Sequence, residues 1–273
     1  MHLVYVPLGA KLFQRFLDSY LKHPAGIEHK LVIMFNGFAE EKELSPFFEI
    51  INSLDLEYET ILSAEKYDLG SYFSAARKLD SEYLLFLNSY SIILADDWLR
   101  FYYSAIRQPN VGVVGSSGGG WRSEFKRFRE NAKYSFLENP KPFVFMRINF
   151  GKFRGKHLRT NAFMVKRELF LSLTYHKLSP AFLPNHSAKE TKAKTLYFEH
   201  GNQSMTYQIA KKGLKAIIVD KYGNTHEPEN WCQAKTFWIS NQENLLIHDN
   251  QTLRYETGDE QVRKELSFWA WGA

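Results

Sequence analysis

The sequence has very little cysteine and no long apolar run. One cysteine, Cys232, stands among 273 residues, which excludes an internal disulfide and a metal site built from cysteine ligands, and agrees with a reducing compartment. The apolar stretch near the first residue is interrupted by Lys11, too early for a membrane span or a signal-peptide core. We therefore expect a cytoplasmic chain.

Two common catalytic arrangements are also missing. Cys232 has no recognisable partner motif for nucleophilic catalysis, and no Gly-x-Gly-x-x-Gly pattern follows the first predicted strand. The stretch GSSGGG at 115–120 lacks the Gly-Lys-Ser/Thr ending of a phosphate-binding loop. We interpret it as a flexible turn near the mouth of an active site.

Positive charge is in modest excess overall but is concentrated in one region. The formal net charge is +5 and the isoelectric point is near 9.0. Between Arg122 and Arg167, thirteen Lys or Arg residues stand against three Glu residues. Such a segment is a solvated basic loop, or it binds a phosphate-bearing substrate, an anionic membrane surface or nucleic acid.

Apolar segments and helical patterns alternate along much of the chain. A hydrophobic content of 44% over this length supports one substantial core. The predicted strands lie at 3–9, 30–38, 58–64, 82–87, 111–115, about 160–166 and 214–220, with helices between most of them. Because several strands are apolar on both faces, we predict an α/β fold, a mostly parallel central sheet with helices on both faces. Its ligand site should lie at the carboxyl ends of the strands.

Polar turns follow four of the predicted strands or lead into the next helix. They are Pro7-Leu8-Gly9, Asn36-Gly37, Asp68-Leu69-Gly70 and Asn88-Ser89-Tyr90-Ser91. Their order and spacing resemble the family 2-like glycosyltransferases with the GT-A (nucleotide-diphospho-sugar transferase) fold, over about residues 2–220. In that family a Pro-containing turn comes first, a loop of the form Asn-x-Gly leads a helix, and the fourth strand ends in Asp-x-Asp.

The resemblance implies a nucleotide-sugar donor and a site for it. The implied donor-binding residues are Pro7, Gly9, Asn36, Asp68, Gly70, Asn88, Ser89 and Tyr90. It also implies a GT-A-like catalytic domain over 1–220, with a basic insertion at about 121–156. We expect residues 221–273 to form an aromatic-rich extension packed on the same domain, with most of its tryptophans in core or anchoring roles.

A later segment, 197–220, resembles the part of the family in which an acid opens a helix that ends in Gly. In inverting members an acid there acts as the general base, which removes a proton from the acceptor hydroxyl. The resemblance aligns Glu199 with the family's Glu, and His200 with its usual catalytic Asp, so the base is one of these two. We favour Glu199, whose carboxylate needs only modest tuning. Its alternative role is that of an acid complementing a helix N-terminus.

The turn Asn88-Ser89-Tyr90 departs from Asp-x-Asp. Neither Asn nor Tyr brings the charge that Mn²⁺ or Mg²⁺ prefers, so no cofactor is assigned with certainty. The resemblance leaves open a divalent metal held by amide oxygens, phosphate and water, with His248 as a late ligand. Alternatively, basic side chains neutralise the leaving diphosphate. The candidates for that role are Arg154, Lys156, His157 and Arg159.

Two nearby acids, Asp96 and Asp97, do not restore the missing motif. They lie beyond the strand end and next to the apolar residues Trp98 and Leu99. We predict that Asp96 caps a helix there and that Asp97 lies in its first turn.

Three functions remain open at this point. The first is an inverting glycosyltransferase that uses a saccharide or lipid-linked glycan acceptor, in cell-surface glycan synthesis by family association. The second is an inactive relative that binds a sugar nucleotide or a glycan. The third is a basic α/β interaction protein. Nucleic acid is the less favoured partner, and peripheral contact with the inner face of the membrane stays open.

Overall fold

The computed structural model describes residues 1–38, 40–65, 67–120, 128–129, 131, 135–151, 156–175 and 187–272. Its main sheet has eight strands in the order β11-β10-β6-β9-β4-β1-β2-β3. These strands are β1 (His2–Tyr5), β2 (Lys30–Asn36), β3 (Tyr58–Ser63), β4 (Tyr83–Leu87), β6 (Val111–Gly115), β9 (Ala162–Lys166), β10 (Lys215–Val219) and β11 (Thr225–His226).

The sheet is mostly parallel, as the sequence predicts. Strands β1 to β4 pair in parallel, and so do β6 and β10, whereas β9 runs antiparallel to both β4 and β6. At the edge, β11 is antiparallel to β10. Since β9 runs the other way, its first residue lies at the edge where the parallel strands end.

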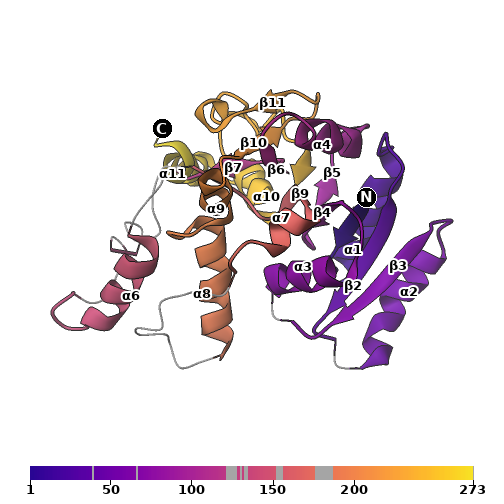
Figure 1. The fold of residues 1–273 in the computed structure, drawn as a ribbon, viewed down its shortest axis with the longest axis horizontal. Helices are drawn as coiled ribbons and strands as arrows, with labels where there is room; N and C mark the ends of the chain where they lie inside the picture. The colour runs from indigo at the N-terminus through magenta and orange to yellow at the C-terminus, as the bar shows by residue number, and fades with distance from the viewer. Residues whose placement is uncertain are drawn as a thin grey trace.

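Helices cover both faces of this sheet (Figure 1). On one face lie α1 (Ala10–Lys22), α2 (Ser45–Asn52) and α4 (Trp98–Ile106). On the other lie α3 (Tyr67–Lys78), α7 (Arg167–Leu171), α8 (Ser187–His200) and α9 (Met205–Lys211). The α/β prediction is therefore confirmed, with helices on both faces of a mostly parallel sheet.

Strand side chains alternate between two apolar cores, as a period of two requires. In β1, Leu3 and Tyr5 enter the core beneath α1, while Val4 packs beneath α3. In α1, Phe13, Phe16 and Leu17 are buried, and the Tyr5 ring stacks on Phe16 with centroids 3.8 Å apart. Leu21, in the last turn of the same helix, is 48% exposed.

The remaining elements complete the fold. They are η1 (Glu41–Leu44), β5 (Ile92–Ile93), β7 (Gly118–Gly119), α6 (Pro140–Phe150), β8 (His157–Leu158), η2 (Pro228–Asn230), β12 (Ile247–His248), α10 (Asn250–Thr257) and α11 (Glu260–Trp271). Helix α6 lies beside α8 at one side of the molecule (Figure 1), and the two share a small aromatic cluster of Phe145, Phe150 and Tyr197. Across the described ranges, no helix has both the length and the apolar character needed to cross a membrane.

The residues after Asp220 pack on the same two cores. Strand β12 pairs with β5, and Ile247 joins the core beneath α1 and α4. Trp231 is fully buried in the opposite core and donates its indole N–H to the carbonyl of His226 at 2.9 Å. Trp271 donates likewise to the carbonyl of Phe237. These two tryptophans therefore anchor the tail, the role expected for most of them.

Candidate functional site

The carboxyl edge of the parallel strands brings several of the predicted segments together. Strand β4 ends beside the start of β9, and the Asn88 amide N–H donates to the Asn161 carbonyl at 2.9 Å. On the other side of β4, Val6 at the end of β1 donates to the Leu87 carbonyl at 3.3 Å. The turn after β4 therefore lies between the ends of two neighbouring strands.

The predicted residues at the ends of β1 and β2 and at the start of α3 mainly shape the backbone. Pro7 is buried, and Gly9 precedes α1 in an extended conformation, with its carbonyl accepting from the Phe13 N–H. Asn36 is the last residue of β2, and its side-chain oxygen is buried with no hydrogen-bond partner among the described residues. Gly70 is buried inside α3.

The turn Asn88-Ser89-Tyr90 uses its polar side chains to hold its own shape. The Asn88 side-chain oxygen accepts from the Tyr90 N–H at 3.1 Å and from the Ser91 hydroxyl at 3.2 Å. The Ser89 hydroxyl donates to the Val6 carbonyl at 2.7 Å, and the Tyr5 hydroxyl donates to the Ser89 carbonyl at 2.9 Å.

This turn does not fit a divalent metal. It carries no carboxylate, its amide oxygen already accepts two hydrogen bonds, and its serine hydroxyl faces the core. Nor does any group of three or more His, Cys, Asp or Glu residues suited to a metal ion occur within the described part of the chain. No chemical step is therefore derived through a metal at this turn.

Asp68 stands where the resemblance places the first residue of the Asn-x-Gly loop. It lies in the first turn of α3. The helix begins at Tyr67, so the predicted turn Asp68-Leu69-Gly70 lies inside it. Burial, and then the negative charge of Glu199, raise the pKa of the Asp68 carboxyl from 3.8 to about 6. A helix N-terminus favours a carboxylate, but burial outweighs that effect here.

Glu199 lies in the last turn of α8, so the expectation of a helix-opening acid is wrong. Helix α8 ends at His200 and α9 begins at Met205, which leaves Glu199 at the carboxyl end of a helix dipole. Its carboxylate accepts hydrogen bonds from both the N–H and the hydroxyl of Thr160, each at 3.2 Å. Thr160 was not foreseen from the sequence.

Packing between α3 and α8 places Asp68 and Glu199 at the same edge. The Phe73 ring on α3 meets the Phe198 ring on α8 edge to face, with centroids 5.6 Å apart. Tyr72 is fully buried, stacks on Phe86 of β4 and has a hydroxyl without a partner among the described residues. Burial, and then the charges of Asp68, Tyr5 and Glu199, raise the Tyr72 pKa well above its usual value.

Two imidazoles lie next to this edge. The rings of His157 and His200 have centroids 5.2 Å apart. Burial, and then the nearness of His200 and Arg159, hold the pKa of His157 well below its usual value, so that its ring is neutral. His200 also lies beside Phe150, with centroids 6.1 Å apart.

Two of the basic residues predicted to neutralise a diphosphate are engaged with the C-terminal segment. The Lys156 ammonium donates to the Pro228 carbonyl at 2.5 Å, and Arg159 forms a buried ion pair with Asp249 at 2.5 Å. The Arg159 guanidinium also lies 4.3 Å from the centre of the Phe237 ring. Arg154, the remaining arginine of this set, lies outside the described residues.

His248, considered as a late metal ligand, has both ring nitrogens in hydrogen bonds. Its Nδ1 lies 2.7 Å from the Thr252 hydroxyl, and its Nε2 lies 2.5 Å from a carboxylate oxygen of Glu256. These contacts place the ring at the start of α10, where Asp249 caps the helix by accepting from the Gln251 and Thr252 N–H groups.

The stretch 115–120 is buried and ordered, so the expectation of a flexible turn is wrong. Ser116 and Ser117 are fully buried, and β7 pairs with β8. A methyl group at Gly118 would lie 2.4 Å from the Trp231 ring, closer than atoms can approach. Glycine is needed here for packing against the tail.

The predictions that Asp96 caps α4 and that Asp97 lies in its first turn are both wrong. The helix begins at Trp98, and Asp97 precedes it with a left-handed φ of 59° and no side-chain capping bond. The Asp96 carboxylate lies 2.7 Å from Nδ1 of His23, and the Asp97 carboxylate pairs with Arg100. These tertiary and local partners replace the capping role.

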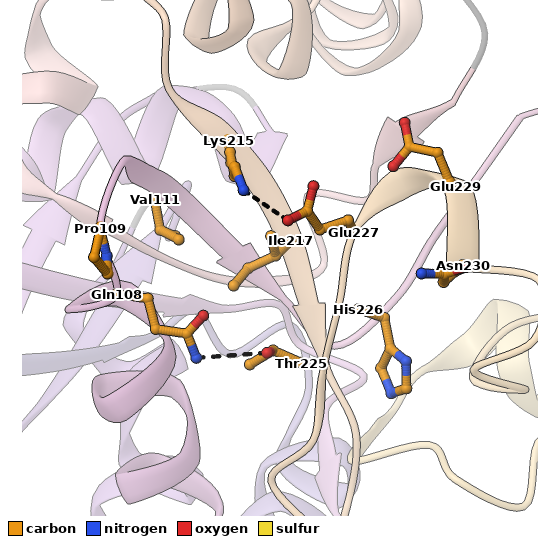
Figure 2. Close-up of a pocket in the computed structure, with 10 residues that line it drawn as sticks. All are labelled: Gln108, Pro109, Val111, Lys215, Ile217, Thr225, His226, Glu227, Glu229 and Asn230. Atoms are coloured by element: carbon orange, nitrogen blue, oxygen red, sulfur yellow. Dashed lines mark hydrogen bonds and ion pairs between the residues drawn. The ribbon is translucent and has the colours of Figure 1, made fainter.

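A hollow lies at the opposite edge of the sheet, where β6 and β10 begin (Figure 2). Its polar side chains bond to one another: Lys215 lies 2.7 Å from a Glu227 carboxylate oxygen, and the Gln108 amide lies 3.5 Å from the Thr225 hydroxyl. The residues singled out by the sequence do not line it.

Comparison with known proteins gives likeness to solved structures alone. No protein-family model and no curated protein sequence matches the chain. Among solved structures, it is similar to a mannosyltransferase from Pyrobaculum calidifontis in complex with GDP-mannose and Mn²⁺ (TM-score 0.43, 15% identity, 79% of this chain and 53% of that one).

It is also similar to mouse xyloside xylosyltransferase 1 (TM-score 0.40, 14% identity, 74% of this chain and 78% of that one). A third is 4-diphosphocytidyl-2C-methyl-D-erythritol synthase from Anaerococcus prevotii (TM-score 0.45, 11% identity, 80% of this chain and 87% of that one). Values of this size describe likeness of fold and not likeness of activity.

Proposed function

We propose that the protein is a glycosyltransferase that moves a sugar from a nucleotide-sugar donor to a saccharide acceptor with inversion. The observation that carries this proposal is the placement of Glu199. Its carboxylate is held by two hydrogen bonds from Thr160 at the carboxyl edge of the sheet, where α/β proteins bind ligands. The same edge contains buried polar side-chain atoms that have no hydrogen-bond partner among the described residues, in Asn36, Tyr72 and Asn161.

Glu199 acts as the general base in this proposal. Its carboxylate takes the proton of an acceptor hydroxyl while that oxygen bonds to the anomeric carbon of the donor. The bond from the anomeric carbon to the diphosphate oxygen breaks, and the nucleoside diphosphate leaves with the electron pair. A carboxylate fixed by two donors on a rigid segment keeps its orientation through this step.

The donor occupies the ends of β1, β2 and β4 in this proposal. The residues that contribute to that surface are Pro7, Gly9, Asn36, Asp68, Gly70, Asn88, Ser89 and Tyr90. The turn at Asn88 leaves no place for a resident metal, so the leaving diphosphate is neutralised by basic side chains of the segment from Arg122 to Arg167, with Arg154 the first candidate. The proposal also includes a saccharide or lipid-linked glycan acceptor and a role in cell-surface glycan synthesis. It places the protein in the cytoplasm, in contact with the inner face of the membrane.

A second candidate function is binding of a sugar nucleotide without transfer. The same turn favours this function, because the side chains of Asn88 and Ser89 form local hydrogen bonds and do not hold a metal at the diphosphate. The two candidates differ in whether the donor is consumed.

The test combines binding and turnover in the full chain. Calorimetric titration with UDP, GDP, CDP and their sugars identifies the donor, and release of the nucleoside diphosphate with a panel of saccharides measures transfer. Glu199→Gln should lower transfer at least about 100-fold while the donor still binds, because general-base catalysis contributes effects of that size. His200→Gln is the matched variant and should retain transfer.

The alternative outcomes are equally definite. Intact transfer in Glu199→Gln with loss in His200→Gln moves the base to His200. Donor binding without turnover under any acceptor supports the binding function instead. Absence of binding to every nucleotide and nucleotide sugar overturns both.

A further inference from the structure

The carboxyl edge holds polar groups that the proposed transfer step does not use. Tyr72 is fully buried, and its hydroxyl has no hydrogen-bond partner in the described ranges. Asn161 is 6% exposed, and neither its amide nitrogen nor its amide oxygen has a partner there. Buried polar groups in folded proteins are nearly always paired, so those left over at an edge of this kind point to a bound molecule.

These groups lie near the two acids of the edge. Tyr72 lies one helical turn after Asp68 on α3, so the two side chains share a face. The charges of both Asp68 and Glu199 act on the Tyr72 hydroxyl. Asn161 directly follows Thr160, which holds Glu199, and its backbone carbonyl accepts from Asn88. Three elements, α3, α8 and the start of β9, therefore meet at one place.

The hydrogen-bonding capacity of this place matches that of a polyol. Tyr72 offers a hydroxyl, Asn161 an amide donor and acceptor, and Asp68 a carboxylate that accepts. A sugar hydroxyl donates one hydrogen bond and accepts others, so adjacent hydroxyls of one ring can satisfy all three side chains.

The charge of this place is unfavourable to an anion. Among the described residues, neither Asp68 nor Glu199 has an ion-pair partner, while Lys156 and Arg159 are bound to the C-terminal segment. A second carboxylate brought next to Asp68 would be repelled in a partly buried setting, where like charges interact strongly.

We infer that Asp68, Tyr72 and Asn161 form a subsite that binds the hydroxyl groups of a neutral glycosyl unit and rejects a glycosyl unit that carries a carboxylate. This inference rests on the proposed function, because it concerns the sugar of the same donor. Asp68 is its specificity-determining residue.

The test compares donors that differ only at the sugar's terminal carbon. Three pairs of donors are titrated into the full chain at pH 7.5. They are UDP-glucose and UDP-glucuronate, UDP-galactose and UDP-galacturonate, and GDP-mannose and GDP-mannuronate. The wild-type protein should bind the neutral member of its preferred pair at least about tenfold more tightly, a ratio equivalent to one charge repulsion in a partly screened site. Asp68→Asn should reduce the ratio below about threefold.

Two further variants keep the result interpretable. Tyr72→Phe removes the unpartnered hydroxyl and keeps the ring, and it should weaken the neutral donor about fivefold without lowering thermal stability. Asp80→Asn, an exposed acid just beyond the same helix, should leave the ratio unchanged. Equal binding of both members by the wild-type protein, or an unchanged ratio in Asp68→Asn, would overturn the inference while leaving the proposed function in place. No binding of any pair would overturn the proposed function itself.

Discussion

The guanidinium of Arg159 lies 2.5 Å from the carboxylate of Asp249, and both residues are more than nine-tenths buried. The pair joins the segment that leads into β9 to the start of α10, ninety residues further along the chain. Burial alone would raise the pKa of the Asp249 carboxyl, but the nearby guanidinium outweighs it and holds that pKa below its usual value. Thr160, the next residue, accounts for both hydrogen bonds to the Glu199 carboxylate, so this pair anchors the turn between β8 and β9 that positions the proposed base.

Breaking this pair should be costly. Asp249→Asn leaves the Arg159 charge buried without its partner, and we expect the free energy of unfolding to fall by about 3–5 kcal/mol in urea denaturation. Because the Asp249 pKa is lowered in the folded protein, its contribution is present above pH 4 and is lost as the pH falls through the folded value.

The matched control is an exposed ion pair of similar length. Lys215 lies 2.7 Å from Glu227, and both side chains are about half exposed. Glu227→Gln should therefore cost less than about 1 kcal/mol. Equal losses in the two variants would contradict the role given to burial.

Asp68 should make stability fall as the pH rises. Its folded pKa of about 6 exceeds the value of 3.8 for an exposed aspartate, so the folded protein binds the proton more tightly. That contribution is complete below pH 3.8 and is lost as the pH rises through 6. Asp68→Asn should therefore stabilise the protein at pH 7.5 by up to about 3 kcal/mol and give no gain at pH 4. Thermal melts from pH 4 to 8, with Asp80→Asn alongside, measure this; a pH-independent difference would refute it.

Thr160 should act on the rate of transfer through the orientation of Glu199. Thr160→Val removes the hydroxyl bond to the Glu199 carboxylate and keeps the backbone bond. One hydrogen bond to a charged group is worth about 1.5–3 kcal/mol, so kcat should fall at least about tenfold while the KM for the donor changes little. Thr160→Ser keeps a hydroxyl and should restore the rate. A loss confined to KM would assign Thr160 to donor binding instead.

Donor binding should depend little on divalent metal. The oxygen of Asn88 accepts two local hydrogen bonds and the hydroxyl of Ser89 faces the core, so the turn after β4 offers Mn²⁺ no charged ligand. The dissociation constant of the preferred nucleotide sugar should change less than about threefold between 1 mM EDTA and 1 mM Mn²⁺, read by titration calorimetry. A tenfold tightening by Mn²⁺ would show that a metal is held here after all.

Gly118 should tolerate no side chain. An added methyl group would lie 2.4 Å from the fully buried Trp231 ring, and overpacking of this kind costs about 1–3 kcal/mol. Gly118→Ala should lower the urea midpoint accordingly. Gly9→Ala is the control, because a methyl group there meets nothing within 4 Å and the backbone is extended; a loss in the control as large as in Gly118→Ala would remove the packing explanation.

The sheet could be predicted because its evidence is local. Apolar runs such as 84–87 are bounded by turn residues, and alternation with helical patterns is enough to place parallel strands between helices. The antiparallel direction of β9 was not predicted. It depends on the pairing of Asn161 with Asn88 across more than seventy residues, and no local pattern encodes that contact.

The sequence predicted which residue types form the candidate site, but it predicted their positions on the helices less well. Glu199 was expected to open a helix, but α8 extends to His200, so the acid stands at the opposite end of the dipole. The sequence predicts that Asp96 caps a helix, but its carboxylate instead contacts the imidazole of His23, at the end of α1. In both cases a tertiary contact or an unforeseen helix overrides the short-range pattern.

The glycines of 115–120 also show that a local sequence pattern does not predict tertiary packing. Glycine-rich stretches favour turns when judged by backbone freedom alone. Here Gly118 is required because Trp231, from a distant part of the chain, occupies the space of a side chain.

The contacts of Lys156 and Arg159 with the C-terminal segment bear on how far the chain could be shortened. Without residues 221–273, the Lys156 ammonium would lose the Pro228 carbonyl, Arg159 would lose its counter-ion, and the space beside Gly118 would stand empty. A fragment ending at Asp220 would keep every strand of the main sheet except β11. Even so, we expect it to be insoluble or unfolded when expressed alone, so that the tail belongs to the cooperative folding unit.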